Sequence, residues 1–218
     1  MSTENNVGAV QLSARLRGVS PPVTRRLLIT EQASLAQLHA TLQVAFGWSD
    51  EHLYSFQIRG WQFGDPARAI ELALNGGGVD MLLAAFAFEI NEAFRYQYNL
   101  FVPWEIDCRI ESRGLIRMAQ PLACLAARGD PPDEELNGPA AYPDWLEGSN
   151  PSWALHQIEE LLDDHLDEER FRAEARDILA NTRLGPPRRR AIDQRLKALP
   201  AVDWDVGRLY ENADSADH

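Results

Sequence analysis

The sequence predicts an α+β protein: a mostly antiparallel sheet with helices packed on it, plus a C-terminal helical extension. Through much of the first half of the chain, apolar and polar residues alternate with a period of two, which is typical of strands with one buried face. In the second half, apolar residues recur at helical spacing. Because strands and helices are segregated rather than alternating as βαβ units, an antiparallel sheet is favoured.

The strand pattern covers residues 10–16, 23–29, 54–58, 94–98 and 104–110. Gly18 and Pro21-Pro22 mark a turn between the first two segments, which we expect to pair. Gly60 marks a second turn, which makes a short hairpin with residues 61–63, and the last two segments form a hairpin in the middle of the sheet. Residues 79–86 fit either a helix or a strand, and residues 120–151 are loop-like.

Helical spacing predicts a helix over residues 35–46, which Ser34 can cap and Gly47 can end. Further helices are expected over residues 152–166, 168–179 and 186–199. The tail from Ala201 is acidic. We therefore divide the chain into an α+β domain at residues 8–181 and a helical extension with an acidic tail at residues 182–218.

Charge and composition exclude several classes of protein. The net charge of −12 disfavours nucleic-acid binding by the chain as a whole, although residues 183–197 hold six basic side chains against the single acid Asp193. No apolar run approaches the roughly 20 residues that cross a bilayer, and the N-terminus lacks a signal peptide. We expect a cytoplasmic protein with two free thiols, Cys108 in the core and Cys124 in a loop.

Neither the histidines nor the glycines form a recognisable catalytic, metal or cofactor site. His39 and His52, with Asp50 or Glu51, offer too few ligands for a convincing metal site, and His39 is expected at the edge of the core. The glycine run at residues 76–78 lacks the Lys-Ser/Thr of a phosphate-binding loop. The sequence therefore predicts no metal and no cofactor.

Two adjacent arginines, Arg25 and Arg26, must point to opposite faces of their strand. One of them is expected to be exposed. The other is expected to pair with a buried carboxylate, for which Glu89 and Asp107 are candidates.

The segments "LRGVSPPVTRRLLI" and "SLAQLHATLQVAFGWSDEHLYSFQI" together resemble the plasmid pRi open-reading-frame-three-like family, some of whose members travel as TnpR-like passengers of insertion elements. "FRYQYNLFVPWEI" and "CLAARGDPPDEELNGPAAY" resemble its later segments. The resemblance implies an α+β fold with an antiparallel sheet and brings no established activity.

The chain departs from the family pattern at positions where relatives carry polar groups. It has Tyr54 in place of His, Asn99 and Val102 in place of Asp, Ile106 in place of His, and Asp130 in place of Cys. The aromatic and proline positions of the pattern are retained. The resemblance therefore implies that a polar or metal site built from those groups is largely absent.

Three functional hypotheses remain. The first is a non-enzymatic interaction or accessory domain of mobile-element origin with an unknown protein partner. The second is a ligand-binding or hydrolytic domain whose aromatic pocket is lined by His52, Tyr54, Tyr98, Trp104 and Tyr142. The third is contact with an anionic partner, such as nucleic acid, through Arg188, Arg189 and Arg190.

Overall fold

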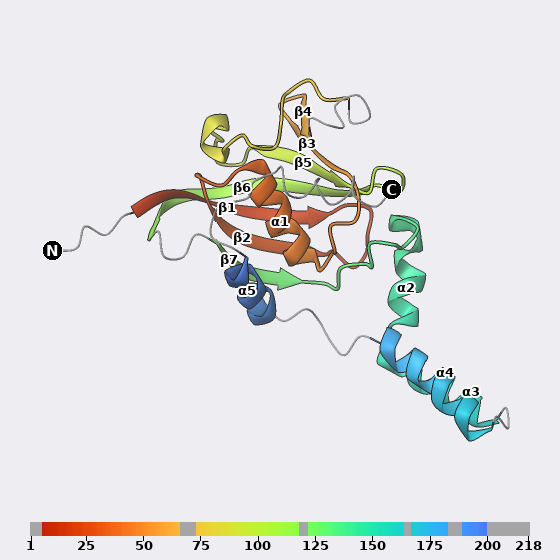
Figure 1. Cartoon of the computed structure of the whole chain (residues 1–218). Coiled ribbons are helices and arrows are strands. Elements are labelled where there is room, and N and C mark those ends of the chain that lie inside the picture. Colours follow the sequence, from red (N-terminus) through yellow and green to blue (C-terminus); the bar gives the residue numbers. More distant parts are fainter. Residues whose placement is uncertain (1–5, 66–72, 118–121, 164–166, 183–188, 200–218) are drawn as a thin grey trace, which may run out of the picture.

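The computed structural model describes residues 6–65, 73–117, 122–163, 167–182 and 189–199. Its centre is a seven-stranded sheet in the order β4-β3-β5-β6-β1-β2-β7, in which each strand is antiparallel to its neighbours (Figure 1). The strands are β1 (Asn6–Leu16), β2 (Thr24–Thr30), β3 (Tyr54–Ile58), β4 (Trp61–Gly64), β5 (Ala93–Tyr98), β6 (Trp104–Arg117) and β7 (Leu122–Arg128). This confirms the predicted α+β class.

Five α-helices accompany the sheet in the described residues. They are α1 (Leu35–Phe46), α2 (Tyr142–Gly148), α3 (Pro151–Asp163), α4 (Glu168–Asn181) and α5 (Arg189–Ala198). Within the same part of the chain, the connections contain two short 3-10 turns, η2 (Leu83–Phe86) and η3 (Pro139–Ala141). Residues 79–86, which fitted either regular structure, therefore contain one 3-10 turn.

The two faces of the sheet differ in polarity. The even-numbered residues 10–16 of β1, 94–98 of β5 and 104–110 of β6 are buried, and α1 lies across this apolar face (Figure 1). On the opposite face, arginines pair with carboxylates from neighbouring strands, as in Arg26 with Glu111 and Arg95 with Asp107. One buried and one solvated face is the arrangement that the alternating pattern predicted.

Local sequence explains where α1 begins and ends. The Ser34 side chain accepts from the backbone N–H of Gln37, while the Gln37 side chain accepts from the N–H of Ser34, which forms a capping box. Gly47 ends the helix at φ 78°, a left-handed conformation that costs glycine little. The predicted bounds of this helix are thus confirmed.

The loop predicted over residues 120–151 is wrong at its start and also near its end, where Tyr142–Gly148 forms helix α2. Leu122–Arg128 forms the edge strand β7, paired with β2, and buries Cys124. Its sequence, LACLAAR, shows no alternation, and its register with β2 shifts at a bulge between Arg26 and Leu27. Such an alanine-rich strand is recognised from its pairing with β2 and its packing on α5, and not from its own sequence.

Helix α5 belongs to the same core as the sheet. Ile192 and Leu196 are buried in that core, and α5 packs on β7 and α1 (Figure 1). Asp193 accepts from the N–H of Cys124, while Arg189 donates to the carbonyl of Leu125. These contacts cover backbone groups of an edge strand, where exposed groups invite unwanted pairing. Pro186, Pro187, Arg188 and the acidic tail lie outside the described residues.

Candidate functional site

A chain of hydrogen bonds joins α1, β5 and the segment after α1. His39 is buried between these elements, with its Nδ1 2.7 Å from the Tyr96 hydroxyl and its Nε2 2.6 Å from Asp50 Oδ1. Tyr54 stacks on the imidazole with ring centroids 3.5 Å apart and planes within 4°. Helical spacing puts Gln43 one turn after His39, where its amide also reaches Tyr96.

The partners fix the direction of each hydrogen bond. The Gln43 amide nitrogen can only donate, so the Tyr96 oxygen accepts from it at 2.8 Å. The Tyr96 hydroxyl then donates to Nδ1 of His39, which leaves the imidazole proton on Nε2. That proton is donated to Asp50. The result is a neutral histidine held between a tyrosine and a carboxylate.

Burial dominates the electrostatics of this network. Desolvation lowers the pKa of His39 below its ordinary value of 6.5, and the hydrogen bond to Asp50 only partly opposes that effect. Burial likewise raises the pKa of Tyr96 well above its usual range. Both groups are therefore neutral at physiological pH.

Asp50 connects the network to solvent. Its side chain is 40% exposed, and its backbone has a φ of 66°, a left-handed conformation that aspartate tolerates better than most residues. This conformation accompanies the contact with His39. The network can move a proton between Asp50 and the ring only by charging a buried imidazole, which is costly.

A second network lies beside the first and holds the segment that contains Pro131-Pro132. The Tyr98 hydroxyl donates to Glu134 Oε2 at 2.5 Å and accepts from the N–H of Glu51. Ser49 N–H donates to the other oxygen of Glu134. Burial, followed by the bond to Glu134, raises the pKa of Tyr98.

Two tryptophans complete this attachment. The indole N–H of Trp48 donates to the Pro132 carbonyl, and that of Trp104 donates to the Glu134 carbonyl. Trp48 also stacks on Phe46 and Tyr98. The aromatic and proline positions retained from the family pattern therefore tie a loop to the end of the sheet.

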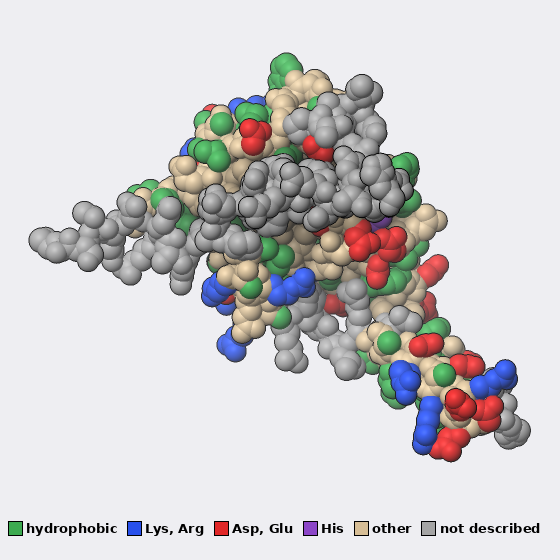
Figure 2. Space-filling model, in the orientation of Figure 1, with side chains coloured by type: hydrophobic (Ala, Val, Ile, Leu, Met, Phe, Trp, Pro, Cys, Tyr) green, Lys and Arg blue, Asp and Glu red, His purple; other side chains and the backbone are tan. Residues whose placement is uncertain are grey.

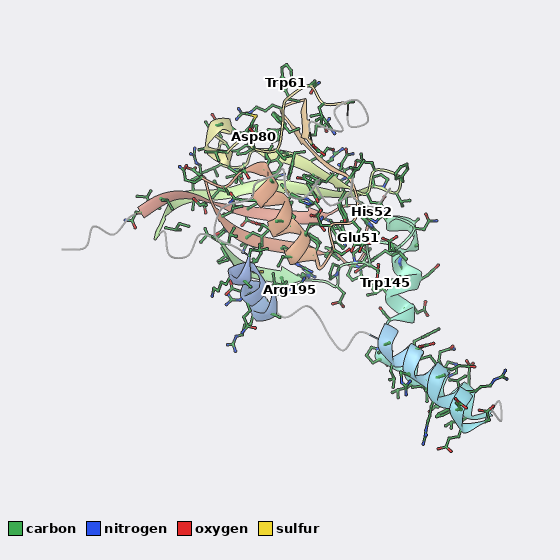
Figure 3. All side chains as sticks on the ribbon, viewed as in Figure 1. Glu51, His52, Trp61, Asp80, Trp145 and Arg195 are labelled. Atoms are coloured by element: carbon green, nitrogen blue, oxygen red, sulfur yellow. The ribbon has the colours of Figure 1, made fainter. Side chains whose placement is uncertain are left out.

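The predicted pocket residues occupy different environments. Tyr98, Trp104 and Tyr142 are fully buried, whereas Tyr54 and His52 are half-buried. His52 approaches Tyr98 and hydrogen-bonds Glu135, and it lies with Glu51 at the end of the sheet nearest α2 (Figure 3). Tyr142 stacks on Trp145 and donates to the Asp130 carbonyl. Three of the five proposed lining residues are thus core residues with structural partners.

Two of the positions that depart from the family pattern lie at the first network. Tyr54 stacks on His39, and Ile106 lies opposite Tyr96 in the β5–β6 register. Tyr54 therefore borders the buried histidine, and Ile106 is the cross-strand neighbour of the tyrosine that binds it. In the sequence these two positions are 52 residues apart, and the strand register together with the packing of α1 brings both of them to the first network.

The predicted partner of the buried arginine was wrong. Arg25 is the buried one, but its guanidinium donates to the carbonyls of Ala45, Thr24, Arg128 and Gly129 rather than to Glu89 or Asp107. Arg26 is exposed, as expected of one of the pair, and binds Glu111. Desolvation lowers the pKa of Arg25 to about 10, so it remains charged.

The basic residues of α5 are partly engaged by the protein itself. Arg189 donates to Leu125, and Lys197 pairs with Asp193 at 2.8 Å. Arg190 and Arg195 are exposed. Arg188 lies outside the described residues.

The feature that sequence reasoning missed is a projecting helical hairpin made of α3 and α4, which we call the α3–α4 hairpin. It extends away from the sheet beyond α2 (Figure 1), and its main contacts are between its own helices and with α2. Leu155, Leu162 and Leu179 on it are 64%, 62% and 58% exposed. Green apolar patches mark its surface in Figure 2.

No group of three or more His, Cys, Asp or Glu side chains in the described residues could hold a metal ion. None of the helices in the same residues combines the length and apolarity needed to cross a membrane.

Comparison with known proteins places the chain in a family. Residues 8–177 match the plasmid pRiA4b ORF-3-like proteins. The uncharacterised protein y4hQ of Sinorhizobium fredii is 31% identical over 152 residues, which cover 67% of this chain and 76% of that protein. A crystal structure of a protein of unknown function from Methanosarcina mazei covers 80% of this chain and 89% of its own, at 19% identity and a TM-score of 0.56, and so shares the fold. The chain belongs to the plasmid pRiA4b ORF-3-like family.

Proposed function

We propose that this protein is a non-enzymatic interaction domain of mobile-element origin that acts in the cytoplasm and binds a protein partner through the α3–α4 hairpin. The observation that carries this proposal is the exposure of Leu155, Leu162 and Leu179 on an element that projects from the body. Covering one leucine side chain contributes roughly 1.5–3 kcal/mol, so leaving three in water forgoes a substantial free energy. Exposed apolar clusters of this kind mark interaction sites.

The arrangement of the polar groups supports a non-enzymatic role. His39, Asp50, Tyr96 and Gln43 bind one another, and Tyr98 and Glu134 anchor a loop. In this arrangement they stabilise contacts between α1, β5 and the neighbouring loops. The plasmid origin that names the family supports the mobile-element part of the proposal.

Binding measurements with the products of neighbouring genes test this function. A transposase or conjugation protein encoded beside the gene is expected to bind the purified chain in isothermal titration calorimetry. Leu155→Glu with Leu162→Glu should abolish that binding. Leu115→Glu is the matched control, because Leu115 is 72% exposed but lies on β6.

Two results would contradict the proposal. Equal binding by the hairpin variant and the Leu115→Glu control would remove the hairpin as the contact surface. If the neighbouring genes instead form a metabolic operon whose products bind through another face, the mobile-element role is wrong.

Contact with an anionic partner through α5 is the second candidate, favoured by the exposure of Arg190 and Arg195. Few phosphate contacts are available there, so binding to duplex DNA is expected to be weak and salt-sensitive. Fluorescence anisotropy at low salt tests this alternative. Unchanged binding after Arg190→Ala with Arg195→Ala would eliminate it.

A further inference from the structure

The exposed side chains of the α3–α4 hairpin form two strips with matching spacing. On α3, Leu155, Glu159 and Leu162 follow one another at i, i+4 and i+7. On α4, Arg172, Arg176 and Leu179 have the same spacing. Residues at these intervals share one side of a helix, and all six are exposed.

Both strips lie on the same face of the hairpin. The half-buried residues Ile158 and Leu161 of α3, with Phe171, Ala175 and Ile178 of α4, form the seam between the helices. On each helix, most strip residues directly follow a seam residue in the sequence, and successive residues are 100° apart around the helix axis. Each strip therefore lies about a quarter turn from its seam, in the same rotational sense on both helices. Because the helices run antiparallel, an equal rotation about each axis points both strips to one side of the hairpin.

The two strips also correspond along the hairpin. Glu159 lies four residues before Asp163, where α3 ends, and Arg172 lies four residues after Glu168, where α4 begins. The two side chains are therefore at the same level along the hairpin. Leu155 lies within a turn of Arg176 and Leu179. One face of the hairpin thus carries Glu159 between two leucines on α3, next to two arginines and a leucine on α4. Arg172 also pairs with Glu168 one turn earlier on α4, but this ion pair is exposed and contributes little, so the guanidinium stays accessible.

We infer that this face binds the same face of a second copy of the chain, so that two hairpins form an antiparallel four-helix bundle. The inference rests on the proposed function and makes a second copy of the chain its partner, in competition with a neighbouring-gene protein for the same leucines. A twofold axis parallel to the helices places α3 of one copy opposite α4 of the other. Glu159 then faces Arg172 of the second copy, and Leu155 approaches Leu179, whereas α3 against α3 would oppose like charges.

The hairpin resembles one half of a four-helix bundle, because its two helices bury few side chains between them. Within α3 and α4, Ala154 is the only described side chain that is buried, and the seam residues are half-buried. Two-helix units of this kind gain a core when a second pair covers them. Each helix is about 20 Å long at 1.5 Å per residue, a footprint below the roughly 800 Å² per partner of standard interfaces. The dimer is therefore reversible, with a Kd on the order of micromolar.

Sedimentation velocity over a range of concentrations tests the dimer on the full chain. The wild-type chain should shift from monomer to dimer as its concentration rises. Leu155→Glu with Leu162→Glu should weaken the dimer at least ~100-fold, since two buried leucines become charged. Leu115→Glu should leave the dimer unchanged.

A charge-swap pair tests the arrangement without removing apolar side chains. Glu159→Arg alone and Arg172→Glu alone should each dimerise more weakly than the wild-type chain, because like charges then face each other. An equimolar mixture should recover the dimer as a heterodimer, since both of its charge pairs are opposite again.

The outcomes separate the two proposals. A wild-type chain that stays monomeric at every concentration overturns the second copy as the partner, and so does a dimer that survives Leu155→Glu with Leu162→Glu. In either case, binding of a neighbouring-gene protein through the hairpin would still support the proposed function. Failure of the charge-swap mixture to dimerise overturns the pairing of α3 with α4.

Discussion

Arg25 supplies the positive charge that helix α1 lacks in its own last turn. Its Nε donates at 2.7 Å to the carbonyl of Ala45, and its Nη1 donates to the carbonyls of Arg128 and Gly129 at the end of β7. A cation at the negative end of a helix is favourable, and these contacts satisfy carbonyls that would otherwise be buried unpaired. One side chain thus joins α1, β2 and β7.

Replacing Arg25 with Met should therefore destabilise the protein by about 3 kcal/mol, because several buried carbonyls lose a charged donor. Arg26→Met is the matched control, since the neighbouring side chain lies on the solvated face and its ion pair contributes little. Urea unfolding measures both. Equal shifts in the midpoint would show that Arg25 is not a structural junction.

His39 makes stability depend on pH. Its folded-state pKa lies below 6.5, so the unfolded chain binds a proton more readily than the folded chain does. The contribution is fully present above about pH 6.5 and is lost as pH falls through the lower folded-state pKa. The ionisable groups that face the ring are Asp50, Tyr54, Tyr96 and Tyr98.

The expected result is a fall in the free energy of unfolding as pH drops below about 6.5, and His39→Gln should reduce that fall. Imidazole resonances in a nuclear magnetic resonance titration report the folded-state pKa directly. A His39 that titrates above 6.5 would mean that the Asp50 carboxylate, rather than burial, controls the ring.

At the scale of elements, α5 and β7 depend on each other. Leu196→Ala should cost about 2–4 kcal/mol, because the side chain is buried against the core. It should also speed hydrogen exchange of the Cys124 amide, whose acceptor is Asp193 on the same helix. The adjacent Arg195→Ala is the control, since Arg195 is exposed. Equal effects of the two variants would place α5 outside the cooperative core.

The same elements show what the sequence could predict. Strands with one buried face were recognisable because Tyr96 and Ile106 alternate with polar neighbours, and α1 was recognisable from its caps. The edge strand β7 was not, because its burial depends on α5 and on a bulge rather than on its own pattern.

The candidate site was less predictable than the fold. An aromatic residue that lines a pocket and one that fills a core look alike in sequence, and Trp104 and Tyr142 belong to the core. The acceptors of Arg25 are backbone carbonyls, which carry no sequence signal. The hydrogen bond between His39 and Tyr96 could not be predicted, because it depends on how α1 packs on β5, and sequence periodicity alone does not specify that packing.

At the scale of the whole molecule, the body and the α3–α4 hairpin are separable units. The hydrophobic cluster of the body draws on the sheet, α1, Tyr142 of α2, and α5, but its buried members include no residue of α3 or α4. The hairpin starts and ends close to α2, because its two helices run antiparallel (Figure 1). We therefore expect its removal to leave the sheet and its covering helices intact.

Replacing residues 151–181 with a short Gly-Ser linker should yield a folded protein whose thermal midpoint lies within about 5 °C of the full chain, because few buried contacts are lost. Circular dichroism and amide exchange measure this. The same variant should sediment as a monomer at concentrations where the full chain associates. A collapsed or unfolded variant would show that the hairpin supports the body, whereas a folded variant that still dimerises would place the contact between copies on the sheet or on α5.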